Sequence, residues 1–176
     1  MVPAFVRAGV SPESIPALSM RMRFGRDSWE EGGINWDTEA GIVLRNAKGR
    51  WKKKPVALVG FKPDWDMLIV EQLQGVGGKK KVFSSIRWER LLVWLLVTLA
   101  QETGWYDEVC IVPARKLHWY DHPVGKKFKI KDSKKRAIRL KEHQTRLSAR
   151  YDGTARALGF KWDGHRELWV HKLKTG

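Results

Sequence analysis

The stretch of sequence that decides the fold is Asp66-Met-Leu-Ile-Val-Glu-Gln72-Leu-Gln-Gly75-Val-Gly77-Gly78-Lys79. Its apolar first half is typical of a strand, and its second half is a glycine-rich turn ahead of a long apolar segment. Glycine lets the backbone turn tightly and approach a ligand closely, and free N–H groups in front of a helix favour an anion. We therefore expect the N–H groups around Val76 to be unpaired and to bind a phosphorylated cofactor or a nucleic-acid backbone.

The segments before this turn predict an antiparallel meander. The runs 40–45 and 55–61 are partly β-branched and are separated by turn residues, and a third strand is expected at 65–73. A chain of 176 residues corresponds to about one domain. We expect an irregular or short helical lead-in over 1–33, which shows no sustained period, and a single domain over 34–176.

The segments after the turn predict a strand-helix-strand crossover. The helix is expected to begin at Ser84 or Ser85, either of which can cap its first turn, and to end at Gly104. Because the helix is apolar on nearly every face, it should be covered on most sides. The strand 108–113 is apolar on both faces and is expected to be central and parallel to the strand before the helix.

The C-terminal part predicts one more helix and a hairpin. Apolar residues recur at three and four residue steps between Leu140 and Leu158, which indicates an amphipathic helix that ends at Gly159. The runs 160–162 and 168–170 flank a turn and predict a closing hairpin. The expected fold is therefore α/β with a mixed sheet, in which an antiparallel meander leads into a strand-helix-strand crossover with a basic insertion.

The charge of the chain favours a polyanionic partner. Lysine and arginine number 34 against 19 acidic residues, which gives a net charge of +15 and a pI of about 10.1. Over half of the excess lies in 126–150, within a basic segment 114–150 that has eleven lysines and arginines and two acidic residues from 126 onward. The alternative is a basic surface without a partner.

Nucleic acid, and RNA more than DNA, is the predicted partner, because lysine and arginine neutralise phosphates and nearby aromatic rings stack on unpaired bases. The alternating lysines of 126–131 are equally compatible with a solvated edge strand. The predicted contacts are Lys79, Lys80, Lys81, Arg115, Lys116, Trp119, Lys126, Lys127, Lys129, Lys131, Lys134, Lys135, Arg136 and Arg139.

Several classes of site and location are disfavoured. The single cysteine, Cys110, lies in an apolar run and is expected to pack as a small hydrophobic residue. The longest apolar run, 91–100, is too short to cross a bilayer, and the N-terminus lacks the pattern of a signal peptide, so we expect a cytoplasmic protein without a membrane partner. His118, Asp121 and His122 have a metal-ligand spacing only on a helix, which Pro123 disfavours, and no metal is predicted.

The order of these elements resembles the GNAT acyltransferase superfamily over about residues 40–173. Gln72-Leu-Gln-Gly75-Val-Gly77 matches the family pattern of Gln or Arg, two residues, Gly, one residue, and Gly or Ala, and Ala157-Leu-Gly159-Phe160 is similar to the motif at the end of its last helix. The resemblance implies that acetyl-CoA binds between splayed strands on either side of the helix. It also implies that its pyrophosphate contacts Gln72, Leu73, Gln74, Gly75, Val76, Gly77, Gly78 and Lys79.

The activity that the resemblance implies is acyl transfer from CoA to an amine, here on a nucleic-acid-associated substrate such as tRNA. This reaction needs a base and an acid, for which the candidates are Glu71 and Tyr151. The alternatives are a solvated strand residue for Glu71 and a core-edge aromatic for Tyr151. A non-catalytic RNA- or DNA-binding protein on the same scaffold is the alternative function, because the tyrosine of many members falls at Ala155 and the segment 78–84 intervenes before the helix.

Overall fold

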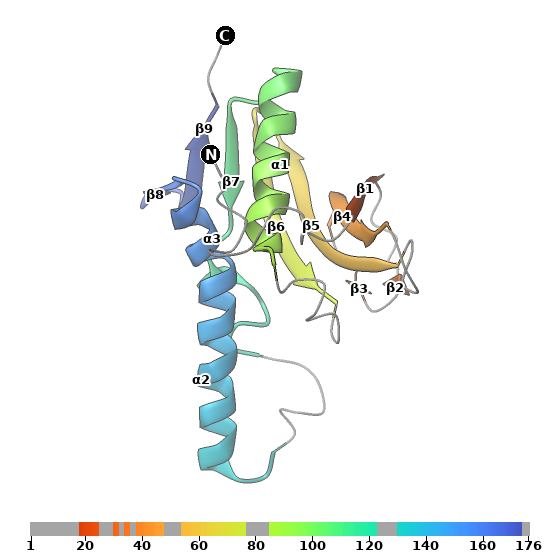
Figure 1. The fold of residues 1–176 in the computed structure, drawn as a ribbon. Coiled ribbons are helices and arrows are strands. Elements are labelled where there is room, and N and C mark those ends of the chain that lie inside the picture. The colour runs from red at the N-terminus through yellow and green to blue at the C-terminus, as the bar shows by residue number, and fades with distance from the viewer. Residues whose placement is uncertain are drawn as a thin grey trace.

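Among the residues that the structure describes, the chain forms a seven-stranded sheet in the order β1-β4-β5-β6-β7-β9-β8 (Figure 1). The structure is a computed structural model and describes residues 18–24, 30–31, 34–35, 38–47, 54–76, 85–122 and 130–173. Antiparallel pairs lead from β1 to β6, and β6 then pairs in parallel with β7. The predicted mixed α/β fold is confirmed.

The meander consists of β4 (Ala40–Asn46), β5 (Pro55–Asp64) and β6 (Met67–Gly75), as the sequence predicts. β6 begins two residues later than expected, because Trp65 and Asp66 form the turn after β5 and Trp65 adopts a φ of 54°. A separate antiparallel pair is formed by the short strands β2 (Glu30–Glu31) and β3 (Ile34–Asn35).

The expectation of an irregular or helical lead-in is wrong for β1 (Leu18–Phe24), which pairs antiparallel with β4 along its whole length. Its apolar residues, Leu18, Met20, Met22 and Phe24, alternate with polar ones. This two-residue period is that of a strand.

The crossover runs from β6 through α1 (Trp88–Thr103) to β7 (Glu108–Ile111). Met67–Val70 pair in parallel with Glu108–Ile111, so the predicted relation of the two strands is confirmed. α1 lies across one face of the sheet (Figure 1). β7 is central, with β9 (Leu168–Lys172) on its other side.

α1 ends as predicted but begins later and is less covered. Gly104 adopts the left-handed conformation, with φ 65°, and its N–H donates to the carbonyl of Ala100. The N-cap is Arg87, whose side chain makes no capping hydrogen bond, so the prediction of a cap at Ser85 is wrong, and Ser84 lies outside the described residues. The buried residues form one stripe, and Trp94 is 44% exposed, so the expected cover on most sides is also wrong.

The expected amphipathic helix to Gly159 is two helices, α2 (Ser133–Arg150) and α3 (Asp152–Ala157), with Tyr151 between them. Asp132 caps α2 by accepting a hydrogen bond from the Lys135 N–H at 3.0 Å. Much of α2 extends away from the sheet (Figure 1). The predicted closing hairpin is confirmed as β8 (Lys161–Asp163) and β9, and the short 3₁₀ helix η2 (Ala114–Lys116) follows β7.

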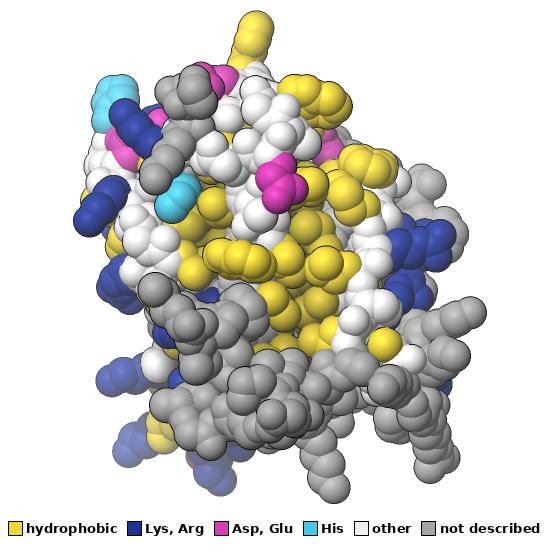
Figure 2. All heavy atoms as spheres, turned by 45° about the horizontal axis from the view of Figure 1, so that its top comes forward, with side chains coloured by type: hydrophobic (Ala, Val, Ile, Leu, Met, Phe, Trp, Pro, Cys, Tyr) yellow, Lys and Arg dark blue, Asp and Glu magenta, His cyan; other side chains and the backbone are white. Residues whose placement is uncertain are grey.

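The main hydrophobic core joins α1 and α3 to one face of the sheet. Toward the C-terminal end of α1 this core remains open, and Figure 2 shows apolar side chains gathered on the surface there. They surround a hollow of about 250 Å³ between α1 and β1, to which Met22, Phe24 and Trp105 contribute. Within the described part of the chain, no helix is long and apolar enough to span a membrane.

The other face of the sheet holds a smaller cluster around the free thiol of Cys110, with Ile69 and Val170. Burial, followed by the charge of Glu108, raises the pKa of the Cys110 thiol to about 11. The thiol therefore stays protonated near neutral pH and packs as a hydrophobic residue, as predicted.

The close packing of Gly60 on β5 is open to a stability test. A Cβ at position 60 would clash with the Thr38 hydroxyl and lie 3.1 Å from Gln72 Cβ, and Thr38 is itself buried. We expect Gly60→Ala to lower the free energy of unfolding by about 1 to 3 kcal/mol, as overpacking does. The measurement is the midpoint of chemical denaturation.

The matched control is Gly164→Ala, because a Cβ there would meet its nearest atom, Trp162 Nε1, at an ordinary 3.7 Å. This variant should change the free energy of unfolding by less than about 0.5 kcal/mol. Equal midpoints for the two variants would contradict the packing argument.

Candidate active site

A β-bulge in β6 creates the candidate site. Gly60 of β5 lies opposite Gln72 and Phe61 lies opposite Val70, so Glu71 is the extra residue. A bulge bends its strand and increases the local twist. β6 pairs with β7 only up to this point: the last ladder partners are Val70 and Ile111, and the N–H of Val112 donates to the Val70 carbonyl. The ladder between β6 and β7 ends here, and we call the region between β6 residues 71–75 and the chain after Val112 the wedge.

Two side chains from the α2–α3 junction contact the backbone of β6 in this wedge. The Leu73 N–H donates to the Tyr151 hydroxyl at 2.8 Å, and the hydroxyl lies within 3.4 Å of the Glu71 carbonyl, to which it donates. The Arg150 guanidinium donates to the Leu73 carbonyl at 3.3 Å. Past the end of its pairing with β7, the backbone groups on this edge of β6 are thus hydrogen-bonded to side chains rather than to a neighbouring strand.

The break between α2 and α3 places Tyr151 in the wedge. Tyr151 has φ −87° and ψ −65°, and its N–H still bonds to the Leu147 carbonyl, so α2 remains regular up to this residue. The side chain is only 1% exposed and belongs to the main core. Tyr151 is therefore held by packing on its ring and by hydrogen bonds on its hydroxyl.

The second predicted catalytic residue, Glu71, reaches the wedge through its backbone. Its carbonyl accepts from Tyr151, whereas its carboxylate pairs with Lys62 at 3.4 Å. Lys62 belongs to β5, which lies on the other side of β6 from β7. The structure thus brings Glu71 and Tyr151 together through the Glu71 carbonyl, while the Glu71 carboxylate is engaged with β5.

The predicted phosphate-binding turn is only partly described, and one expectation about it is wrong. The N–H of Val76 donates to the Val56 carbonyl at 2.9 Å, so it is paired within the sheet and not directed at a ligand. A Cβ at Gly75 would lie 3.1 Å from the Trp88 ring, so this glycine is needed for the packing of Trp88. Gly77, Gly78 and Lys79 lie outside the described residues.

The remaining residues of the predicted cofactor loop belong to the sheet. Gln72 is 5% exposed, and its amide donates to the side chain of Gln74 at 3.1 Å. Leu73 is buried in the main core. The backbone of Leu73 faces the wedge through the contacts described above, so it is the β6 backbone that a bound ligand would meet there.

Cationic groups lie next to the wedge at the start of α1. The Arg150 guanidinium lies 5.5 Å from the centre of the Trp88 ring, and its Nε is 3.8 Å from the Glu89 carboxylate. Arg87, at the N-cap, is exposed. The N-terminus of a 16-residue helix carries partial positive charge, which the Glu89 carboxylate in its first turn partly offsets.

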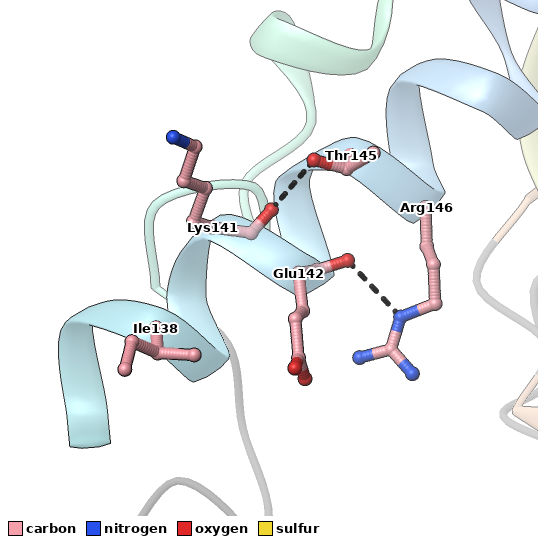
Figure 3. A pocket seen from close by; sticks show the side chains of 5 residues that line it. All are labelled: Ile138, Lys141, Glu142, Thr145 and Arg146. Atoms are coloured by element: carbon pink, nitrogen blue, oxygen red, sulfur yellow. Dashed lines mark hydrogen bonds between the residues drawn. The ribbon is translucent and has the colours of Figure 1, made fainter.

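Of the eight predicted nucleic-acid contacts that the structure describes, four lie on α2 and are exposed. Lys131 precedes this helix, and Lys134, Lys135, Arg136 and Arg139 lie on it. A hollow of about 410 Å³ lies farther along α2. Figure 3 shows side chains that line it, with the Arg146 side chain donating to the Glu142 carbonyl and Thr145 to that of Lys141. The predicted contacts outside the described residues are Lys79, Lys80, Lys81, Lys126, Lys127 and Lys129.

Three predicted contacts lie on the loop after β7. Arg115 and Lys116 both pair with Glu167, at 3.1 and 2.7 Å. Trp119 is half-buried against the main core, and its carbonyl bonds to His143. Sequence reasoning missed two aromatic residues nearby, Trp162 and Trp169, which face each other across the β8–β9 hairpin. The predicted hairpin placed these two tryptophans on its two runs, 160–162 and 168–170, and this was the available signal.

The histidines of the same loop are not on an α-helix. His118 and His122 lie in turns after η2, with ring centroids 6.2 Å apart. Within the described ranges, no group of three His, Cys, Asp or Glu side chains is arranged to hold a metal ion.

Comparison with known proteins gives a similarity of fold. No protein-family model matches the chain, and no curated protein matches its sequence. Among solved structures, the chain is similar to a GNAT family N-acetyltransferase, YhbS from Escherichia coli, in complex with CoA. The similarity has 14% sequence identity and a TM-score of 0.44, and it covers 90% of this chain and 83% of that chain. The structure contains the order of elements on which the sequence resemblance is based: an antiparallel meander, a crossover helix, a parallel strand and a closing hairpin.

Proposed function

We propose that this chain is an acyl-CoA-dependent N-acyltransferase whose reaction centre is the wedge between β6 and β7. The observation that carries the proposal is the Tyr151 hydroxyl, held inside the wedge by the backbone of the strand that bends away. We infer that an extended ligand enters where the parallel strands stop pairing beside the bulge, next to this proton donor.

The residues of the wedge fit an extended acyl-thioester arm. The β6 edge carries alternating acceptors and donors in the Glu71 carbonyl, the Leu73 N–H and the Leu73 carbonyl. An arm with amide groups can pair with such an edge as an added strand does. Tyr151 and Arg150 now occupy these groups, so we infer that binding exchanges part of their contacts for contacts to the arm. The bound acyl-CoA supplies the activated acyl group.

Tyr151 is suited to donate a proton to a leaving thiolate. Its oxygen accepts a short hydrogen bond from the Leu73 N–H, and its hydroxyl donates a longer one, of 3.4 Å, to the Glu71 carbonyl. We infer that the proton passes from this long bond to the leaving thiolate, because a charged acceptor binds a proton more strongly than a carbonyl does. After transfer, the Leu73 N–H remains in place to stabilise the negative charge on the phenol oxygen.

One side-chain acid is enough to account for the bonds and protons of the acyl transfer. The amine nitrogen bonds to the acyl carbon while the carbon–sulfur bond breaks, and Tyr151 protonates the sulfur. Because the Glu71 carboxylate is engaged by Lys62, we assign the surplus proton of the amine to solvent, which then reprotonates Tyr151. The acceptor that we propose is an amine on a nucleic-acid-associated substrate such as an aminoacyl-tRNA. The reason is that the basic helix α2, which can bind phosphates, ends at Tyr151, next to the wedge.

The phosphates of the cofactor would lie at the start of α1. Arg150 has only long contacts there, and Arg87 is exposed beside the N–H groups of the first turn. Two cations and a helix N-terminus can together neutralise a diphosphate.

A second candidate function is nucleic-acid binding without catalysis, and the exposed face of α2 favours it. The helix carries seven lysines and arginines and one glutamate, and its Arg139–Glu142 pair is exposed on both sides. Exposed pairs of this kind hold their cations weakly. The exposed cations of α2 are therefore available to phosphates, whether or not acyl transfer takes place in the wedge.

Acetyl-CoA should stabilise the folded chain. A ligand at one hundred times its dissociation constant adds about 2.7 kcal/mol to the free energy of unfolding, so we expect a higher Tm with acetyl-CoA. Arg150→Gln should reduce the shift, whereas Arg146→Gln, one helical turn away and bonded to its own helix, should leave it unchanged. The measurement is thermal unfolding followed by fluorescence. No shift in the unsubstituted chain at millimolar acetyl-CoA would exclude the transferase.

Removing the Tyr151 hydroxyl should slow transfer more than it weakens binding. We expect Tyr151→Phe to release thiol from acetyl-CoA about 10² to 10⁴ times more slowly in the presence of aminoacyl-tRNA, as loss of a general acid does. The Leu73 N–H loses its partner, which lowers the free energy of unfolding by about 1 to 3 kcal/mol. The acetyl-CoA shift in Tm should remain, and an unchanged rate would remove Tyr151 from the mechanism.

Nucleic-acid binding by α2 should depend steeply on salt. Each phosphate contact contributes about 0.9 to the slope of log affinity against log salt on a duplex and about 0.7 on a single strand. Replacing Lys134, Lys135 and Arg136 by Ala should reduce the slope for single-stranded RNA by about 2. The control removes three exposed cations elsewhere, Arg21, Lys54 and Lys172. Equal slopes for the two variants, or binding independent of salt, would contradict the role of α2.

A further inference from the structure

A hollow of about 300 Å³ lies where the loop after β7, the end of α2, α3 and the β8–β9 hairpin meet. Its lining includes Arg115, Asp152, Arg156, Trp162 and Trp169. This volume is at the lower end of small-molecule sites, which is the size range of a single nucleotide. We call this hollow the hairpin pocket.

The hairpin pocket presents flat surfaces from two tryptophans and two arginines. Trp162 and Trp169 are cross-strand partners with an edge-to-face contact at 5.4 Å. The Arg115 guanidinium lies 5.3 Å from the centre of the Trp162 ring, and that of Arg156 lies 5.6 Å from the Trp169 ring. Trp162 is 41% exposed. Indole rings and guanidinium planes are the surfaces on which unpaired bases stack.

The hairpin that carries these rings is fixed to the sheet. Arg166, in the turn between β8 and β9, donates to Glu108 of β7 at 2.6 Å and to Asp163 at 2.7 Å. Trp169 is anchored as well, because its Nε1 donates to Asp152 Oδ1 at 2.9 Å. The pocket is therefore formed before a ligand binds, which reduces the entropy cost of binding.

Asp152 supplies one hydrogen-bond acceptor at the pocket. Its Oδ1 accepts from Trp169 and from the Ala114 N–H, whereas Oδ2 accepts from no residue in the described part of the chain. A carboxylate oxygen accepts hydrogen bonds and donates none. It therefore favours a base with an exocyclic amino group, which adenine, cytosine and guanine carry and uracil lacks.

The two arginines of the pocket can turn to a phosphate. Glu167, which pairs with Arg115, also binds Lys116 at the shorter distance of 2.7 Å, and this bond to Lys116 lowers the pKa of Glu167. Lys116 alone can thus neutralise Glu167. Arg156 is exposed and forms no ion pair with any of the described residues.

We propose that the hairpin pocket binds one nucleotide of a single-stranded nucleic acid, with its base on Trp162, its exocyclic amino group on Asp152 and its phosphate on Arg115 and Arg156. Ser148 of α2 also lines the pocket, so a strand that leaves it meets the basic helix next. The proposal goes beyond acyl transfer and does not depend on it. It adds base selection to the phosphate contacts of α2.

The test is the affinity of the full chain for labelled ten-nucleotide strands, measured by fluorescence anisotropy at fixed low salt. Oligo(A) and oligo(C) should bind several times more tightly than oligo(U), and Trp162→Ala should weaken binding of oligo(A) about tenfold or more, since stacking on an aromatic ring contributes that much per base. Trp162→Phe should retain most of the affinity. The matched control is Trp105→Ala, because Trp105 is 78% exposed and lies outside the pocket.

Further measurements distinguish binding in the hairpin pocket from binding to α2, and show whether the nucleotide comes from a strand or is free. Trp162→Ala should leave the salt slope unchanged, whereas the α2 triple variant should reduce it for all sequences. Asp152→Asn should reduce the preference for oligo(A) over oligo(U). Competition by free AMP would support a pocket that also accepts single nucleotides, and oligo(A) binding without competition by AMP would support a pocket for strands.

Two outcomes would overturn the proposal. One is equal affinity of oligo(A) for Trp162→Ala and Trp105→Ala, with both variants shown to be folded by circular dichroism. The other is equal affinity of the unsubstituted chain for oligo(A), oligo(C) and oligo(U). If acyl transfer is not observed but sequence-selective binding is, the proposal for the hairpin pocket is unaffected.

Discussion

The extra residue at Glu71 is the constraint on which the site depends. The pairing of β6 with β7 ends at Val70 and Ile111, where the bulge bends β6 and β7 itself ends. The bend leaves backbone donors and acceptors without a strand to pair with. Because unpaired buried backbone groups are costly, other groups must satisfy them, and Tyr151 and Arg150 do so.

This arrangement ties the C-terminal half of the chain to the sheet. Tyr151 can reach Leu73 only because the helix breaks at this residue, and the same break turns α3 onto the core while α2 extends outward. The α2–α3 junction therefore positions the Tyr151 hydroxyl in the wedge, Asp152 at the hairpin pocket and the C-terminal end of the basic helix α2. The wedge, the pocket and α2 are neighbours for this reason.

The sequence predicted the elements well where periodicity and turn residues agree, as in β4, β5, the end of α1 at Gly104 and the closing hairpin. It failed where packing decides. Gly75 matched a phosphate-binding pattern, but in the fold it makes room for Trp88, and the Val76 N–H pairs with β5. Ser85 is a good cap in isolation, yet α1 starts three residues later, at Trp88.

By itself the sequence determined the mixed α/β class, the crossover between β6 and β7, and the concentration of positive charge between 126 and 150, because each follows from local pattern or composition. Only the tertiary structure decided that Glu71 is a bulge, that its carboxylate faces Lys62, and that Tyr151 bonds to a strand 78 residues away. It also brought Trp162, Trp169, Arg115 and Arg156 around one hollow. Register and long-range contact arise from the packing of whole elements, which no local period encodes.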